Sequence, residues 1–172
     1  MVVASPSVST SLGWPVGYWA SEMTHPYYEF TEAGYQVELA SPDGGRVEMD
    51  ALSNPRHESS YSAYDLISMG FLNSPGLAAL LDRTKKLREV EPEGYEAIVV
   101  CGGQSPMFTF RENKVLQSLL ERFYESEKPT AALCHGVAAL IDVKLGDGSF
   151  LIKGKTITGF SNIEEDEAEC NL

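Results

Sequence analysis

The chain has 172 residues, 43% apolar and 22% charged, which is ordinary for one soluble globular domain with a buried core. Its formal net charge of −12 opposes binding to phosphate backbones, so we do not expect nucleic acid as a partner. The first basic side chain is Arg46 and the longest apolar run is residues 97–101, so neither a targeting signal nor a membrane span is expected. Three widely spaced cysteines predict no disulfide framework, and we expect a reducing cytoplasmic location.

The first half of the chain mixes short apolar runs with one helical pattern. Residues 1–5 read as a strand. Residues 17–34 carry aromatic side chains at helical spacing, and Pro26 should break or kink that helix. Residues 36–40 alternate as a strand before a Pro-Asp-Gly-Gly turn. Residues 48–75 form the least regular stretch, and we expect an ordered segment that leaves the sheet.

In the second half of the chain, strand patterns and helix patterns alternate more clearly. Residues 77–87 read as a helix, and residues 97–101 as a buried strand that stops at a Gly-Gly pair. Residues 113–126 have one apolar face and predict an amphipathic helix. Residues 130–133 are a second buried strand, followed directly by a helix over residues 135–140.

Residues 150–152 and 156–158 also read as short strands. Short apolar strands that alternate with amphipathic helices predict a parallel sheet covered on both faces. Chemistry in such sheets gathers at the carboxyl ends of the strands, where the Gly102-Gly103 pair and Cys134 both fall.

Cys134 stands between a buried strand and a helix start made of small residues. A sharp turn of this kind needs a small residue close by, and Gly136 supplies it. The N–H groups at a helix start favour the thiolate, so we expect a lowered thiol pKa. A free cysteine is most often buried and inert, but this setting favours a nucleophile.

Four further positions are candidates for the site. At an elbow His135 could swing beside the sulfur as a base, although adjacent side chains usually diverge. Glu22 would have a raised pKa if buried among aromatic residues, yet the pattern alone favours a solvated helix face. Glu164 and Glu165 could favour a helix start, or one of them could orient His135.

The remaining candidates suggest mostly structural roles. Gly102-Gly103 could present N–H donors to an oxyanion or could simply make a tight turn. Cys101 reads as a core residue, and Cys170 as exposed in an acidic tail. His25 should pack or cap at the Pro26 break, and His57 lies in a polar loop. No metal-ligand spacing is present, so we expect neither a metal nor another cofactor.

Five segments together resemble the ThiJ/PfpI superfamily, and within it the branch of heat-shock chaperones and glyoxalase III proteins. They are GYWASEMTHP, VELASPDGG, the Gly102-Gly103 pair, AALCHG and KTITGFS, in that order along the chain. The resemblance implies the class I glutamine amidotransferase-like fold, a flavodoxin-like three-layer α/β/α sandwich with a mainly parallel sheet.

The resemblance also implies roles for individual residues. Cys134 matches the family nucleophile, His135 its partner, and Glu165 the acidic third member of the triad. Glu22 matches the acid that moves protons in the glyoxalase III reaction. Gly103 and the N–H of His135 match the oxyanion donors.

The implied reaction uses no glutathione, metal or organic cofactor, and its substrate is a small aldehyde. The Cys134 thiolate adds to methylglyoxal, Glu22 moves a proton between the two carbons, and lactate is released. The family's Gly-Gly-His-Gly is Gly102-Gly103-Gln104-Ser105 here, which alters the rim of the pocket, and Val137 replaces a proline.

Family members continue with a further strand and helices, so the resemblance implies that residues 1–172 form a single ThiJ/PfpI-like domain without that element. An unpaired sheet edge near residues 156–160 would then favour a homodimer. Other functions stay open: a holding chaperone, a protein deglycase, a hydrolase or hydratase of the superfamily such as an amidase, peptidase or isonitrile hydratase, or an inactive truncated homologue.

Overall fold

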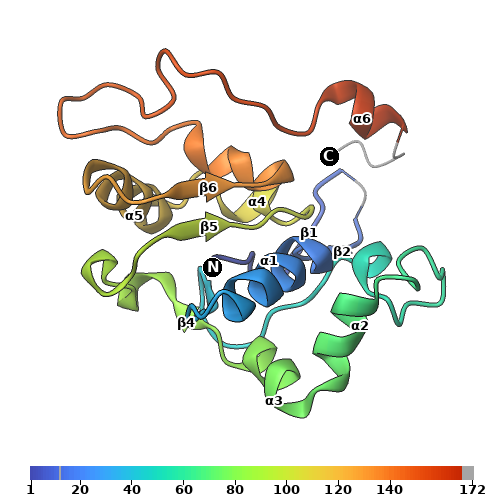
Figure 1. The fold of residues 1–172 in the computed structure, drawn as a ribbon. Helices are drawn as coiled ribbons and strands as arrows, with labels where there is room; N and C mark the ends of the chain where they lie inside the picture. The colour runs from blue at the N-terminus through green and yellow to red at the C-terminus, as the bar shows by residue number, and fades with distance from the viewer. Residues whose placement is uncertain (12, 168–172) are drawn as a thin grey trace.

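The computed structural model describes residues 1–11 and 13–167 and has a parallel sheet at its centre (Figure 1). The strands of this sheet are β3 (Ala40–Ser41), β4 (Lys85–Lys86), β5 (Ile98–Val100) and β6 (Thr130–Ala132). Val2 forms parallel bridges with both Ala40 and Val100, so the amino-terminal segment lies between β3 and β5. The spatial order is therefore β4, β3, the Val2 segment, β5 and β6, with every neighbouring pair parallel.

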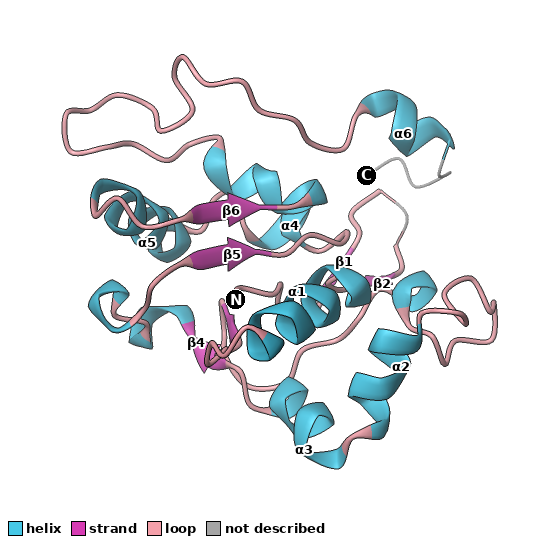
Figure 2. Ribbon diagram, in the orientation of Figure 1, coloured by secondary structure: helices cyan, strands magenta, loops and turns pink. Residues whose placement is uncertain are grey.

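The order of the strands reverses direction at Val2, because β3 and β4 lie on one side of it and β5 and β6 on the other. Such a switch point, at the carboxyl ends of parallel strands, is where α/β proteins bind ligands. A separate antiparallel pair, β1 (Ser7–Val8) with β2 (Pro15–Val16), lies near that end of the sheet (Figure 2).

Helices cover both faces of the sheet. They are α1 (Ala20–Glu32), α2 (Leu66–Asn73), α3 (Pro75–Ala78), α4 (Pro106–Thr109), α5 (Lys114–Glu125) and α6 (Asn162–Glu167). The 3₁₀ segments are η1 (Ala51–Ser53), η2 (Ala79–Asp82), η3 (Leu87–Glu89), η4 (Pro92–Gly94) and η5 (Cys134–Leu140). Among the described residues, no helix has the length and apolar character that crossing a bilayer requires.

In the central part of the sheet, alternate residues along the chain enter two separate cores. Val2 and Val100 pack with the apolar face of α5, whereas Val3 and Cys101 pack with Met23 of α1 and with part of α2. This is the side-chain alternation of a pleated strand covered on both faces. The predicted three-layer α/β/α sandwich is confirmed.

Helix α1 runs through Pro26 without a break, so the predicted interruption is wrong. A proline has no N–H to donate to the carbonyl four residues earlier, which here belongs to Glu22. The thiol of Cys101 donates to that carbonyl instead, with 3.4 Å between sulfur and oxygen. The buried thiol thus satisfies an acceptor that the proline leaves open.

Three other predicted elements differ in the structure. The helix expected over residues 77–87 ends early, because the N–H of Lys85 donates to the Leu39 carbonyl and starts β4. The helix expected over residues 135–140 is the 3₁₀ segment η5. Residues 150–158 form turns and loop rather than strands, held by a single antiparallel bridge between Lys144 and Phe150.

Asp65 joins α1 to α2 and gives a test of this packing. Its carboxylate accepts the Ser68 N–H at the start of α2 (3.0 Å) and lies 2.8 Å from His25 Nε2 on α1. Burial acts to raise the pKa of Asp65, but hydrogen bonds from Ser68 and His25 outweigh it and lower the pKa. The ionised Asp65 carboxyl therefore stabilises the folded state fully above the usual pKa of aspartate. This stabilisation is lost as the pH falls through the lowered pKa of the folded state.

We expect Asp65→Ala to reduce the free energy of unfolding by about 1 to 2 kcal/mol at neutral pH, the typical value of a helix cap. The difference from wild type should shrink as the pH falls below about 4, because the wild-type carboxyl becomes protonated. Urea denaturation at several pH values measures this. A difference that persists unchanged in acid would show that Asp65 acts through packing alone.

Candidate active site

Cys134 sits on a strained turn where β6 meets η5. Its φ of 48° lies in the left-handed region, which non-glycine residues adopt at a cost. A side chain at Gly136 would place its Cβ 2.8 Å from the Cys101 carbonyl oxygen and 2.9 Å from that of Val100. The prediction that Gly136 permits a tight elbow is confirmed.

The side chains of Cys134, His135 and Glu165 form a continuous row. Cys134 Sγ lies 3.4 Å from His135 Nδ1, and His135 Nε2 lies 2.5 Å from Glu165 Oε1. The imidazole is 7% exposed, and Phe160 packs against it with 4.7 Å between ring centroids. A buried carboxylate at one ring nitrogen fixes the orientation of the other towards the sulfur.

The two adjacent glutamates of α6 have different roles. The Glu164 carboxylate accepts the Ser161 N–H (2.7 Å), while the Ser161 hydroxyl accepts the Glu164 N–H (3.3 Å). This reciprocal pair is a capping box, which starts α6. Glu165, one residue further on, points to His135. Glu164 therefore favours the helix start, and Glu165 contacts His135, as the two sequence alternatives proposed for this pair.

Glu22 reaches the sulfur from the opposite side, from the first turn of α1. Its carboxylate accepts the Gly102 N–H at 2.7 Å and shares a hydrogen bond with the Cys134 thiol. Burial raises the pKa of Glu22, although the bonds from Gly102 and Cys134 act against it. The alternative of a solvated helix face is wrong.

The predicted lowering of the Cys134 thiol pKa is also wrong. Burial and the negative charge of Glu22 raise that pKa to about 12, although the N–H groups of His135 and Gly103 both point at the sulfur and act to lower it. Because the thiol and the carboxyl interact closely, they titrate as a pair.

Three successive N–H groups after β5 have three different acceptors. Gly102 donates to Glu22, Gly103 to the Cys134 sulfur, and Gln104 to Asp50 Oδ2 at 2.7 Å. Gly103 has a φ of 102°, and a Cβ there would lie 2.5 Å from the Trp19 nitrogen. The Gly-Gly pair is thus both a tight turn and a source of N–H donors.

Asp50 is a site residue that sequence reasoning missed. It lies in the irregular stretch after β3, and its carboxylate binds only backbone N–H groups, so no motif marks it. The indole N–H of Trp14 donates to Gln104 Oε1 at 3.2 Å, so the side chain of Gln104 contacts the loop that precedes α1.

The remaining candidates lie apart from this row. Cys101 is fully buried, and burial raises its thiol pKa to about 12. His25 pairs with Asp65, and His57 hydrogen-bonds to Ser59 in its own loop. Cys170 lies outside the described residues. Within those residues, no cluster of three or more His, Cys, Asp or Glu side chains has a geometry that could hold a metal ion.

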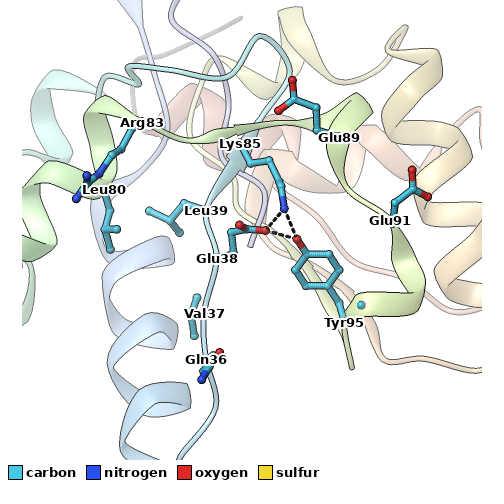
Figure 3. A pocket seen from close by; sticks show the side chains of 11 residues that line it. Gln36, Val37, Glu38, Leu39, Leu80, Arg83, Lys85, Glu89, Glu91 and Tyr95 are labelled. Atoms are coloured by element: carbon cyan, nitrogen blue, oxygen red, sulfur yellow. Dashed lines mark hydrogen bonds and ion pairs between the residues drawn. The ribbon is translucent and has the colours of Figure 1, made fainter.

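An open cavity of about 730 Å³ lies elsewhere, at the amino ends of β3 and β5 (Figure 3). Three of its polar side chains bond to one another: Lys85 Nζ is 2.9 Å from Glu38 Oε2 and 3.0 Å from the Tyr95 hydroxyl, which also donates to Glu38. These contacts raise the pKa of Lys85, so its amine stays protonated and is no nucleophile. The chemistry therefore belongs to the Cys134 row at the carboxyl ends.

Several known proteins are similar to this chain in sequence or in fold. The sequence model of the DJ-1/PfpI family matches residues 16–170. The chain is 30% identical to Glyoxalase 3 of Candida albicans over 90% of its own length, and 28% identical to the glutathione-independent glyoxalase HSP31 of Saccharomyces cerevisiae over 89%. It spans only 64% and 63% of those relatives. The structure of Rapid Encystment Protein 24 KDa from Francisella tularensis superposes with a TM-score of 0.86 at 34% identity, over 98% of this chain and 72% of that one.

The two described thiols should differ sharply in reactivity. Iodoacetamide should modify Cys134, which is partly exposed, and leave Cys101 unmodified in the folded protein, because Cys101 has no accessible surface. Peptide mass spectrometry after timed labelling measures both rates. Labelling in urea is the control, where both thiols should react alike. Faster labelling of Cys101 in the native protein would contradict the assignment of Cys134 as nucleophile.

Proposed function

The chain belongs to the DJ-1/PfpI family, and from this membership and the site we propose that it is a glutathione-independent glyoxalase that converts methylglyoxal to lactate. The observation that carries the proposal is the contact between the Glu22 carboxyl and the Cys134 sulfur. A hydrolytic triad needs only the nucleophile, the histidine and its acid. A second carboxyl group at the sulfur itself suits a proton transfer on a bound substrate.

The first step is addition of the thiolate to the aldehyde carbon, which gives a hemithioacetal. For this addition the thiol proton passes to the Glu22 carboxylate, which is hydrogen-bonded to the sulfur and whose pKa is raised by burial. The N–H groups of Gly103 and His135 point at the sulfur, so they lie within reach of an oxygen on the carbon attached to it. They would stabilise the negative charge that develops on that oxygen.

The second step moves a proton between the two carbons. Once Glu22 has given its proton to the alkoxide, its carboxylate can take the proton from the former aldehyde carbon and return it to the neighbouring one. The hydroxyl proton passes at the same time from the first oxygen to the second, which leaves a carbonyl next to sulfur. The product is a lactoyl thioester on Cys134. Water then attacks the thioester, with His135 as base oriented by Glu165, and the thiol and lactate separate. The overall change adds one water to methylglyoxal, and no oxidant or reductant is needed.

Turnover of methylglyoxal without glutathione is the direct test. We expect lactate formation by the wild-type protein and none by Cys134→Ala. Glu22→Gln should lose about 10²- to 10⁴-fold in kcat, because an amide cannot accept and return a proton. The same variant should still react with iodoacetamide at Cys134, since the amide keeps the size of the side chain. Wild-type turnover in Glu22→Gln would exclude the proton-transfer role.

The adjacent glutamates of α6 offer a matched pair. Glu165→Gln should lower kcat/KM at least about 10-fold, because it removes the charge that orients His135 and stabilises its protonated form. Glu164→Gln should stay close to wild type, because glutamine also completes a capping box. Steady-state kinetics of the two variants across pH measures this. Equal losses in both would mean that α6 acts only as a scaffold.

A further inference from the structure

We propose that Asp50 is a positioning residue that aims the Gly103 N–H at the reacting centre. This inference deepens the proposed function and rests on it for the identity of the substrate. Asp50 does not touch the sulfur. It acts through the turn that follows β5, where the N–H groups of three successive residues point to three different acceptors.

Asp50 itself is rigidly held. The residue is 4% exposed, its own N–H donates to the Tyr18 carbonyl (2.8 Å), and its carbonyl accepts the Ser53 hydroxyl (2.8 Å). Its two carboxylate oxygens accept the N–H groups of Gly17 (2.8 Å) and Gln104 (2.7 Å). A charge-assisted pair of this kind fixes both donors in place.

The two carboxylates on either side of Gly103 form a clamp. Glu22 holds the N–H of Gly102 and Asp50 holds the N–H of Gln104, so the peptides that flank Gly103 cannot rotate freely. A glycine with a φ of 102° would otherwise have much conformational freedom. With both neighbours fixed, the Gly103 N–H is left to donate to the sulfur or to an oxyanion beside it.

The Gly17 contact extends the clamp to the helix that carries Glu22. Gly17 lies just before α1, and its carbonyl accepts the Ser105 N–H (2.9 Å). Asp50 thus links the approach to α1 with the turn after β5. Only a carboxylate can accept both N–H groups at once. An amide has one oxygen, and its NH₂ group would face the second donor.

The test compares Asp50→Asn with wild type in two assays. In the first, kcat for methylglyoxal should fall at least about 10-fold with little change in KM, because loss of an oxyanion donor acts on the transition state. In the second, the pH midpoint of Cys134 alkylation by iodoacetamide should rise, because the thiolate loses the Gly103 donor. The charged groups near the sulfur, Glu22 and His135, remain in place.

The direction in which the alkylation midpoint shifts distinguishes a positioning role of Asp50 from an effect of its charge alone. If Asp50 acted only through its charge, its removal would lower the midpoint, since one negative charge fewer favours the thiolate. Asp65→Asn is the matched control, because it makes the same change at another carboxylate that accepts a backbone N–H, and its midpoint should equal that of wild type. Gln104→Pro provides a second variant, which removes the N–H that Asp50 accepts and should reproduce both effects. Because it also removes the side-chain oxygen that accepts the Trp14 indole N–H, Gln104→Ala, which keeps the backbone N–H, is its control for the midpoint.

A wild-type kcat, an unchanged midpoint or a lowered midpoint in Asp50→Asn would overturn the inference. If Asp50→Asn does not fold, wild-type behaviour of a folded Gln104→Pro would overturn it equally. If the wild-type protein does not turn over methylglyoxal, the proposed function fails, but the alkylation midpoint still decides the role of Asp50. The two proposals can therefore fail separately.

Discussion

The parallel register of β5 and β6 is the constraint on which the site depends. Val100 pairs with Ala132, so the residues two positions later, Gly102 and Cys134, lie side by side at the carboxyl ends. A Cβ at Gly102 would lie 2.8 Å from Cβ of Cys134 and 2.7 Å from a Glu22 oxygen. Cys134, Glu22 and the N–H donors of the turn can meet only because this position has no side chain.

The site stabilises its carboxylates mainly with backbone N–H groups. Glu22 and Asp50 together accept three of them, from Gly17, Gly102 and Gln104, and Glu165 is held by the imidazole of His135. A buried carboxylate without such partners would be very costly. In a chain with a net charge of −12, this use of main-chain donors lets acidic side chains lie close together at one end of the sheet.

The sequence predicted those parts of the fold and site that depend on local pattern. Apolar periodicity predicts the three layers and the convergence of the strand ends. The small residue Gly136 predicts the tight elbow at Cys134. The predicted interruption of α1 at Pro26 could not be corrected from local sequence. The Cys101 thiol, which donates to the Glu22 carbonyl that the proline leaves open, is 79 residues away along the chain. Asp50 escaped notice for the same reason, since its donors lie 33 and 54 residues away and are backbone groups with no residue signature.

The contact between Glu165 and His135 depends on the local order of a peripheral segment. Residues 153–161 form a mostly exposed stretch that leads to α6, and few contacts fix its end: Gly159 against Val137, and Phe160 against His135 (Figure 2). A segment with so little buried surface opens at a lower free energy than the sheet does. Opening would withdraw Glu165 while leaving Cys134, Glu22 and the sheet intact. In mild denaturant the contact between Glu165 and His135 would then be lost before the core unfolds, so the protein would retain a native sheet and the pairing of Glu22 with Cys134 while His135 lost its carboxylate partner.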